Sequence, residues 1–275
     1  AGWINRHLQS AVWQNNSPFR AIGMGAMLQS SLQGPAAALA LKSIADFHLR
    51  GRDDQVALME RTLGNLYSIQ APKEGLQQQA AELFSSIDLL AKLTIDEYQP
   101  ANGADYGYSD FGNGLKQIAQ LIKADVGLEI ACVDIGGWDT HEGQGGAEYG
   151  SFQNAISELG QGLTAFYTDL RDYMNGVTVV TMSEFGRRVE ENTSGGTDHG
   201  HGNAMFVMGG GINGGVYSRW PGLAPANLDD GDLAITTDYR DALAEIVISR
   251  MLNPALDAVF PNYTPKPIGL ARQRT

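Results

Sequence analysis

The chain has 275 residues, of which 43% are hydrophobic, so it can bury a sizeable core as one large domain or two small ones. Its formal net charge of -12 argues against nucleic acid or an anionic membrane as the main partner. No apolar run reaches the length of a transmembrane segment, and the first residues lack the pattern of a signal peptide.

The first half of the chain shows the apolar periodicity of helices. Leu, Ile, Ala and Phe recur at helical spacing, with Gly, Pro or Asn at the breaks, in the segments 36–50, 54–68, 75–93 and 113–124. The glycine-spaced stretch with Met24, Met27 and Leu28 is interpreted as core or loop packing, with a ligand pocket as the alternative. Residues 99–112 read as an exposed loop, and a recognition surface is the alternative role of Tyr98, Tyr106 and Tyr108.

The second half changes character near residue 127 and predicts a sheet. Short apolar or β-branched runs indicate strands over 128–134, 177–182 and 204–208. Amphipathic spacing predicts helices over 152–173 and from Thr237 or Asp238 to Asn253, followed by an extended, proline-rich tail. Strand, helix and strand in this order predict a parallel, right-handed unit. We therefore expect a single α/β domain over 1–275, mainly helical over 1–126 and with its sheet core over 127–275.

Two further patterns in this half are interpreted as structural and not as ligand sites. Gly209, Gly211 and Gly214 form a G-x-G-x-x-G pattern, but no helix follows it to hold a pyrophosphate, so it is interpreted as a turn. Cys132 is the only cysteine and lies in an apolar run, which indicates a small core residue.

Two loops combine aspartate and histidine in a way that predicts a metal site. One loop contains Asp139 and His141, and the other contains Asp198, His199 and His201 between glycines. Carboxylate oxygen and imidazole nitrogen are the usual ligands of zinc and of harder divalent ions. Both loops follow predicted strands at their carboxyl ends, where open α/β sheets bind ligands. The alternative is that both loops are turns whose Asp and His side chains cap backbone groups.

These motifs together resemble the DUF1501 family, whose function is undefined and which looks like a branch of the alkaline phosphatase and sulfatase superfamily. The resemblance extends from Gly2 to the last helix. It rests on Gly137-Trp138-Asp139-Thr140-His141, Met182-Ser183-Glu184-Phe185-Gly186-Arg187, Gly195-Gly196-Thr197-Asp198-His199-Gly200-His201-Gly202 and Gly209-Gly210-Gly211. It implies an alkaline-phosphatase-like three-layer sandwich with a mostly parallel sheet.

The resemblance also implies a division of the ligands between two neighbouring ions. Asp198 and His199 would serve one ion, and Asp139, His141 and His201 the other. The expected metal is divalent, with zinc first and manganese, magnesium or calcium as alternatives. Two such ions could clamp a small anionic phosphate or sulfate ester.

Glu184 and Arg187 are the residues assigned to catalysis. Arg187 would bind the anionic oxygens of the ester or, as the alternative, form a structural salt bridge. Glu184 would be the hydrogen-bond partner of a ligand histidine, with metal ligand or turn cap as the alternatives.

The chain also departs from the superfamily pattern. The metal-binding Asp and the nucleophile of its first strand are not found at the head of the chain, so we expect an upstream strand to be missing. Three hydroxyls remain as nucleophile candidates, although a turn or cap role suits each of them better: Thr140, Ser183 and Thr197. The resemblance implies a periplasmic or extracellular protein whose export signal has been removed.

Two functions follow as hypotheses. The first is a metal-dependent hydrolase of phosphate or sulfate esters. The second is a non-catalytic, exported binding or assembly protein that keeps the superfamily fold, self-associates into a homo-oligomer or captures a surface partner, and holds at most one structural ion.

Overall fold

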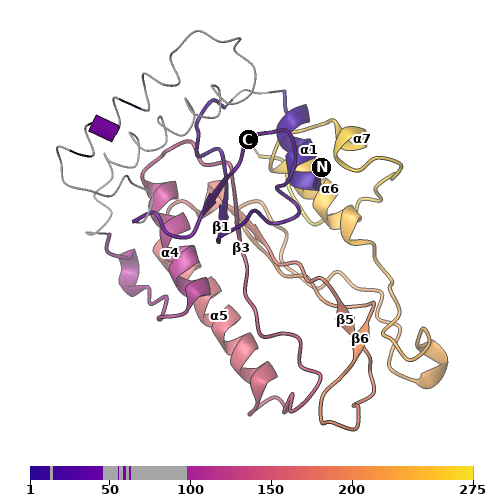
Figure 1. Cartoon of the computed structure of the whole chain (residues 1–275). Coiled ribbons are helices and arrows are strands. Elements are labelled where there is room, and N and C mark those ends of the chain that lie inside the picture. Colours follow the sequence, from indigo (N-terminus) through magenta and orange to yellow (C-terminus); the bar gives the residue numbers. More distant parts are fainter. Residues whose placement is uncertain (13–14, 46–54, 56–57, 60–61, 63–97, 275) are drawn as a thin grey trace.

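The computed structural model describes residues 1–12, 15–45, 55, 58–59, 62 and 98–274 (Figure 1). The helix predicted over 75–93 lies outside the described residues, as does the helix predicted over 54–68 apart from the few single positions just named. None of the helices in the described part of the chain is both long enough and apolar enough to cross a membrane.

A small parallel sheet lies at the centre of the described residues. β1 (Ala21–Met24) is its middle strand, and β2 (Leu39–Leu41) and β3 (Ile130–Val133) pair with it on either side. Ile22 lies opposite Leu39 on one side and Ala131 on the other. All four residues of β1 are buried, as expected of a central parallel strand. The fold is therefore α/β.

The first two strands correct the prediction of a helical first half. The segment predicted as helix over 36–50 contains β2, because pairing with the buried β1 outweighs the helix propensity of its alanines and leucines. β1 was not predicted, since a four-residue run that includes a glycine is too short to show a period. Met24 belongs to the core and Met27 is exposed, as the packing interpretation expected.

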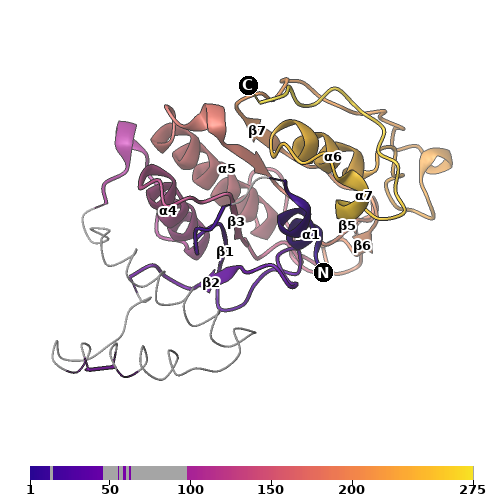
Figure 2. The same cartoon turned by 90° about the horizontal axis from the view of Figure 1, so that it is seen from above.

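Two helices cover this sheet where amphipathic spacing placed them. α4 (Asp110–Lys123) begins at Ser109, whose hydroxyl accepts a hydrogen bond from Gly112 N and caps the first turn. α5 (Ser151–Asp169) packs beside α4, and Figures 1 and 2 show the two helices side by side. Apolar side chains of both helices enter the main core with Phe19 and Ile22.

The remaining strands form two hairpin-like pairs. β4 (Thr178–Val180) pairs antiparallel with β7 (Val207–Gly209), and β5 (Gly186–Arg187) pairs antiparallel with β6 (His199–Gly200). This corrects the predicted parallel unit, because β4 takes β7 and not β3 as its hydrogen-bonded neighbour in the described ladders. Apolar periodicity reports that a run is a strand but says nothing of its partner, since both directions of pairing share a period of two residues.

The C-terminal region contains α6 (Tyr239–Ser249) and α7 (Leu256–Val259), and α7 packs against α1 (Trp3–Ser10). α6 begins where predicted, because the Asp238 side chain accepts a hydrogen bond from Arg240 N. α1 and α7 were not predicted. Three short 3-10 turns complete the described elements: η2 (Ala101–Gly103), η3 (Met174–Gly176) and η4 (Pro225–Asn227).

The segment between residue 98 and α4 is anchored to α5. The hydroxyls of Tyr98 and Tyr106 both donate to Asp169, whose side chain is fully buried and also accepts from Ala101 N and Lys123 Nζ. Only Tyr108 of the three tyrosines is fully exposed. The three tyrosines therefore do not form one exposed surface, because the hydroxyls of Tyr98 and Tyr106 are bonded to Asp169.

Candidate metal centre

Two loops that are distant in the sequence lie against each other and position the candidate ligands. The loop after β3 meets the loop before β6 through three backbone hydrogen bonds, Gly143 N to Ser194 O, Gln144 N to Gly195 O and Thr197 N to Thr140 O. A Cβ on Gly196 would lie 2.3 Å from the carbonyl carbon of His141, so glycine permits this approach.

Asp139, His141 and His199 come together where these loops meet. Asp139 Oδ1 lies 2.7 Å from His199 Nε2 and 3.0 Å from His141 Nε2. Each of the three residues offers a ligand atom, and these atoms all lie within 4.8 Å of one another. The side chains are 62%, 46% and 48% exposed, respectively, so an ion and a ligand can reach them from solvent. One carboxylate and two imidazoles form a donor set that suits zinc.

Asp198 lies at the edge of this cluster. Its Oδ1 atom is 2.9 Å from His141 Nδ1 and accepts a hydrogen bond of 3.1 Å from Asn192 Nδ2. A second hydrogen bond from Asn192 Nδ2 to His141 O ties the two loops together. Asn192 was not singled out in the sequence, where the turn-forming run 192–196 was the only signal for it.

Hydrogen bonds stabilise the charged forms of both aspartates. The pKa of Asp139 is lowered, first by the hydrogen bond from His199 and then by the nearby charges of His141, His199 and Arg187. The pKa of Asp198 is lowered by hydrogen bonds from His141 and Asn192. Both carboxylates are thus held in the form that binds a cation.

An aromatic ring and a guanidinium group support His199. The Phe185 ring stacks on the His199 ring with centroids 4.0 Å apart and an angle of 8° between the planes. Arg187 lies directly opposite His199 in the β5–β6 pair, and its guanidinium carbon is 4.8 Å from the Phe185 ring centroid. The stacked ring restricts rotation of the imidazole, a role that the sequence did not indicate for Phe185.

The guanidinium of Arg187 donates its shorter hydrogen bonds to backbone carbonyl oxygens. Nη1 donates a hydrogen bond of 2.6 Å to Thr197 O, and Nη2 donates to Trp138 O. Asp139 Oδ1 is 3.5 Å from Nη2. Arg187 therefore holds the two ligand loops together, which is closer to the structural alternative than to a side chain free to bind an ester.

Glu184 and His201 lie apart from the cluster. The Glu184 side chain is exposed, and within the described ranges it has no hydrogen bond or ion pair with a histidine. His201 Nδ1 lies 2.9 Å from Asp232 Oδ2, on a turn in which Asp229 and Asp232 bond each other through their backbones. The ligand grouping thus differs from the one implied by the resemblance, because His199 joins Asp139 and His141 while His201 turns to Asp232.

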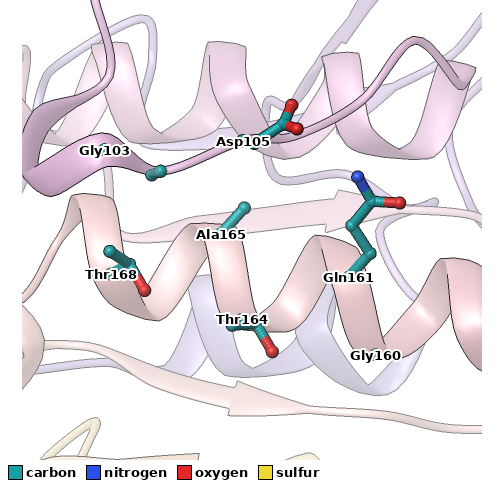
Figure 3. Close-up of a pocket in the computed structure, with 8 residues that line it drawn as sticks. Gly103, Asp105, Gly160, Gln161, Thr164, Ala165 and Thr168 are labelled. Carbon is teal, nitrogen blue, oxygen red and sulfur yellow. The ribbon is translucent and has the colours of Figure 1, made fainter.

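A separate concavity lies between η2 and α5. It has a volume of about 430 Å³ and is lined by residues 103–105 and by α5 side chains that include Gln161 and Thr164 (Figure 3). None of the predicted site residues lines it, and Asp105 is its one charged lining residue. The groove and the candidate metal centre are therefore different sites.

The fold and the site define an α/β protein with a small parallel sheet and a solvent-accessible Asp-His-His cluster between two loops. The profile of the DUF1501 family, described as a protein of unknown function, matches residues 1–251, and the chain belongs to this family. No match was found among curated proteins or among solved structures.

Proposed function

We propose that the chain is a metal-dependent hydrolase of phosphate or sulfate esters. The observation that carries this proposal is the convergence of Asp139, His141 and His199, whose ligand atoms lie within 4.8 Å of one another on an exposed surface. Three protein ligands from carboxylate and imidazole are typical of catalytic zinc sites, which keep one position open. Zinc is the expected ion, with manganese, magnesium or calcium as alternatives.

The contacts around the site suggest a role for each of its residues. Asp139, His141 and His199 would hold the ion, Phe185 would orient His199, and Arg187 would hold the loops in register. When bound, the ion acts as a Lewis acid that withdraws charge from the ester. The alkaline-phosphatase-like three-layer arrangement and a periplasmic or extracellular location belong to the same proposal.

The number of ions follows from the grouping of the ligands. In the part of the chain that the structure describes, Asp139, His141 and His199 are the single group of three or more potential ligands. His201 lies against Asp232, and Asp198 lies against His141 and Asn192, and neither residue belongs to that group. We therefore propose one ion per chain and not the pair that the resemblance implies.

One observation favours a second candidate, a non-catalytic, exported binding or assembly protein with one structural ion. Each hydroxyl considered as a nucleophile already donates a hydrogen bond to an oxygen of the protein. Ser183 Oγ donates to Phe185 O over 2.8 Å, and the hydroxyls of Thr140 and Thr197 both donate over 2.9 Å to Gln144 Oε1. Hydrolysis would then depend on water as the attacking group.

The test is the metal content and the ester hydrolysis of the purified chain and two single variants. Near-stoichiometric metal is expected in the wild type and in His201→Ala, and loss of metal in His199→Ala, because His199 contacts Asp139 whereas His201 contacts Asp232. Hydrolysis of an aryl phosphate or aryl sulfate should disappear with the metal.

Each contrary result points to a different conclusion. Equal metal content in the wild type and His199→Ala would contradict the ligand set. Undiminished hydrolysis in a metal-free His199→Ala variant would contradict the mechanism. Stoichiometric metal without hydrolysis of either ester class would favour the second candidate.

A further inference from the structure

Among the described residues, a buried arginine at the end of α6 has only neutral oxygens as hydrogen-bond partners. Arg250 is 8% exposed, and its guanidinium donates to Asn175 O over 2.7 Å, to Thr178 Oγ1 over 3.4 Å and to Arg272 O over 3.5 Å. Buried charges in proteins are normally paired with an opposite charge, because desolvation is costly.

Two more arginines lie beside Arg250. The C-terminal tail is held in place by hydrogen bonds from Arg272 N to Gly211 O and from Arg274 N to Ser249 O, both of 2.7 Å. The side chains of Arg272 and Arg274 are exposed. Burial lowers the pKa of Arg250, and the positive charges of Arg274 and Arg272 lower it further.

The guanidinium groups of Arg250 and Arg274 both lie near the short turn η3, which contains Asn175 and Gly176. Arg250 Nη2 bonds the carbonyl of Asn175, and Arg274 Nη2 lies 3.9 Å from where a Cβ on Gly176 would be. Over the described ranges, no carboxylate forms an ion pair with any of these three arginines. Three positive charges are thus gathered without an anion, in a chain whose net charge is -12.

The glycine run that follows β7 makes room for this cluster. A Cβ on Gly211, which has a φ of 75°, would lie 2.3 Å from Arg250 Nη1. A Cβ on Gly210 would lie 2.4 Å from the Cα atom of Asn175. Gly211, one glycine of the rejected dinucleotide pattern, therefore allows the backbone to approach the Arg250 guanidinium closely.

We propose that Arg250, Arg272 and Arg274 form a binding site for a tetrahedral oxyanion such as phosphate or sulfate. Guanidinium groups present planar pairs of donors that match the oxygens of such an anion. The anion would supply the charge that Arg250 lacks inside the protein, while the two exposed arginines would complete its shell from the solvent side.

The site is separate from the candidate metal centre. Arg250 bonds Thr178, the first residue of β4, whereas the two loops that contain Asp139, His141 and His199 adjoin β3 and the β5–β6 pair. Figures 1 and 2 both show the C-terminal end of the chain away from β5 and β6. Anion binding here does not depend on the proposed hydrolysis.

The experiment is a calorimetric titration of the full chain with inorganic phosphate, repeated with sulfate, after treatment with a chelator and at constant ionic strength in chloride. Removal of metal prevents the anion from binding at an ion held by Asp139. The variant is Arg272→Ala with Arg274→Ala, which changes two exposed side chains and leaves the buried Arg250 in place. The matched control is Lys116→Ala with Lys266→Ala, which removes the same charge elsewhere.

Saturable binding of one anion per chain is expected in the wild type and in the lysine control. The affinity should fall about tenfold or more in the double arginine variant, because each hydrogen bond between charged groups contributes substantially. Absence of saturable binding in the wild type would overturn the proposal. Equal weakening in the arginine variant and the lysine control would also overturn it, since the effect would then be one of net charge.

Discussion

His199 Nε2 lies 2.7 Å from Asp139 Oδ1, although 60 positions separate the two residues in the sequence. The contact joins the loop after β3 to the β5–β6 pair and places His141 against the same carboxylate oxygen. The candidate site therefore depends on the relative placement of two loops, and residues that hold those loops together should affect metal binding without touching the ion.

Arg187 is the first such residue, because its guanidinium bonds the carbonyls of Thr197 and Trp138 on the two loops. Arg187→Ala should lower the free energy of unfolding by about 2 kcal/mol or more, since each lost bond has a charged donor. It should weaken metal affinity by about 10- to 100-fold through misplaced ligands. Denaturant unfolding and metal titration measure the two effects.

The neighbouring Arg188 is the control for this prediction. The Arg188 side chain bonds Asp230 O and lies near Asp232, and among the described residues it has no hydrogen bond or ion pair with Asp139, His141 or His199. Arg188→Ala should leave metal affinity within about twofold of the wild type, because no ligand depends on it. Equal losses of metal affinity in the two variants would refute a specific role for Arg187.

Glu129 should give the protein a pH-dependent stability. Its side chain is 6% exposed and pairs with His7 and Arg20. Burial by itself raises the pKa of Glu129, but hydrogen bonds from His7 and Arg20 outweigh it, so the pKa lies below its ordinary value of 4.5. The stabilisation is therefore fully present above pH 4.5 and is lost as the pH falls through the lowered pKa.

Glu129→Gln tests this sign directly. At pH 7 the variant should be less stable than the wild type by about 3 kcal/mol, because it breaks a buried ion pair. The difference should narrow in acid, where the wild-type carboxyl also becomes neutral. Urea unfolding at pH 7 and at a series of pH values below 4.5 measures it, and a difference that widens in acid would contradict the assignment.

In the region between η2 and α5, substitution of Asp169 should reduce the stability of the fold more than substitution of any other carboxylate. Its buried side chain accepts hydrogen bonds from Tyr98, Tyr106, Ala101 N and Lys123. Asp169→Asn should cost about 3 to 5 kcal/mol, because the Lys123 ammonium loses its partner and an amide N–H meets other donors.

Asp105→Asn is the matched change at an exposed position of the same region. It should cost less than about 0.5 kcal/mol, as is usual for a surface substitution. Both variants are compared by denaturant unfolding at pH 7. Comparable stability of the two variants would show that the bonds to Asp169 contribute little.

Cys132 should resist thiol reagents in the folded protein. Burial raises the pKa of its thiol to about 11, so little reactive thiolate exists near neutral pH. At pH 8, labelling of the native chain by a maleimide or an aromatic disulfide should be roughly 100-fold slower than labelling in denaturant. Equal rates in the two conditions would show that the β3 thiol is open to solvent.

Local patterns in the sequence were sufficient for several elements. The apolar period of α5 and the cap at Asp238 of α6 predicted both helices to within a few residues. β3 followed from its short apolar run, and the two Asp/His loops were recognised from composition alone. These features depend on neighbours in the chain, so a window of the sequence contains the information that specifies them.

Contacts between distant segments required the tertiary structure. β2 became a strand because β1 was available to pair with it, and β4 took β7 as its partner where a parallel arrangement with β3 was expected. In the same way, two histidines that are two positions apart have different partners, since His199 contacts Asp139 and His201 contacts Asp232. Residue type and spacing predicted which side chains can bind a metal. Long-range packing decides which of these side chains come together at one site. A local sequence pattern contains no information about that packing.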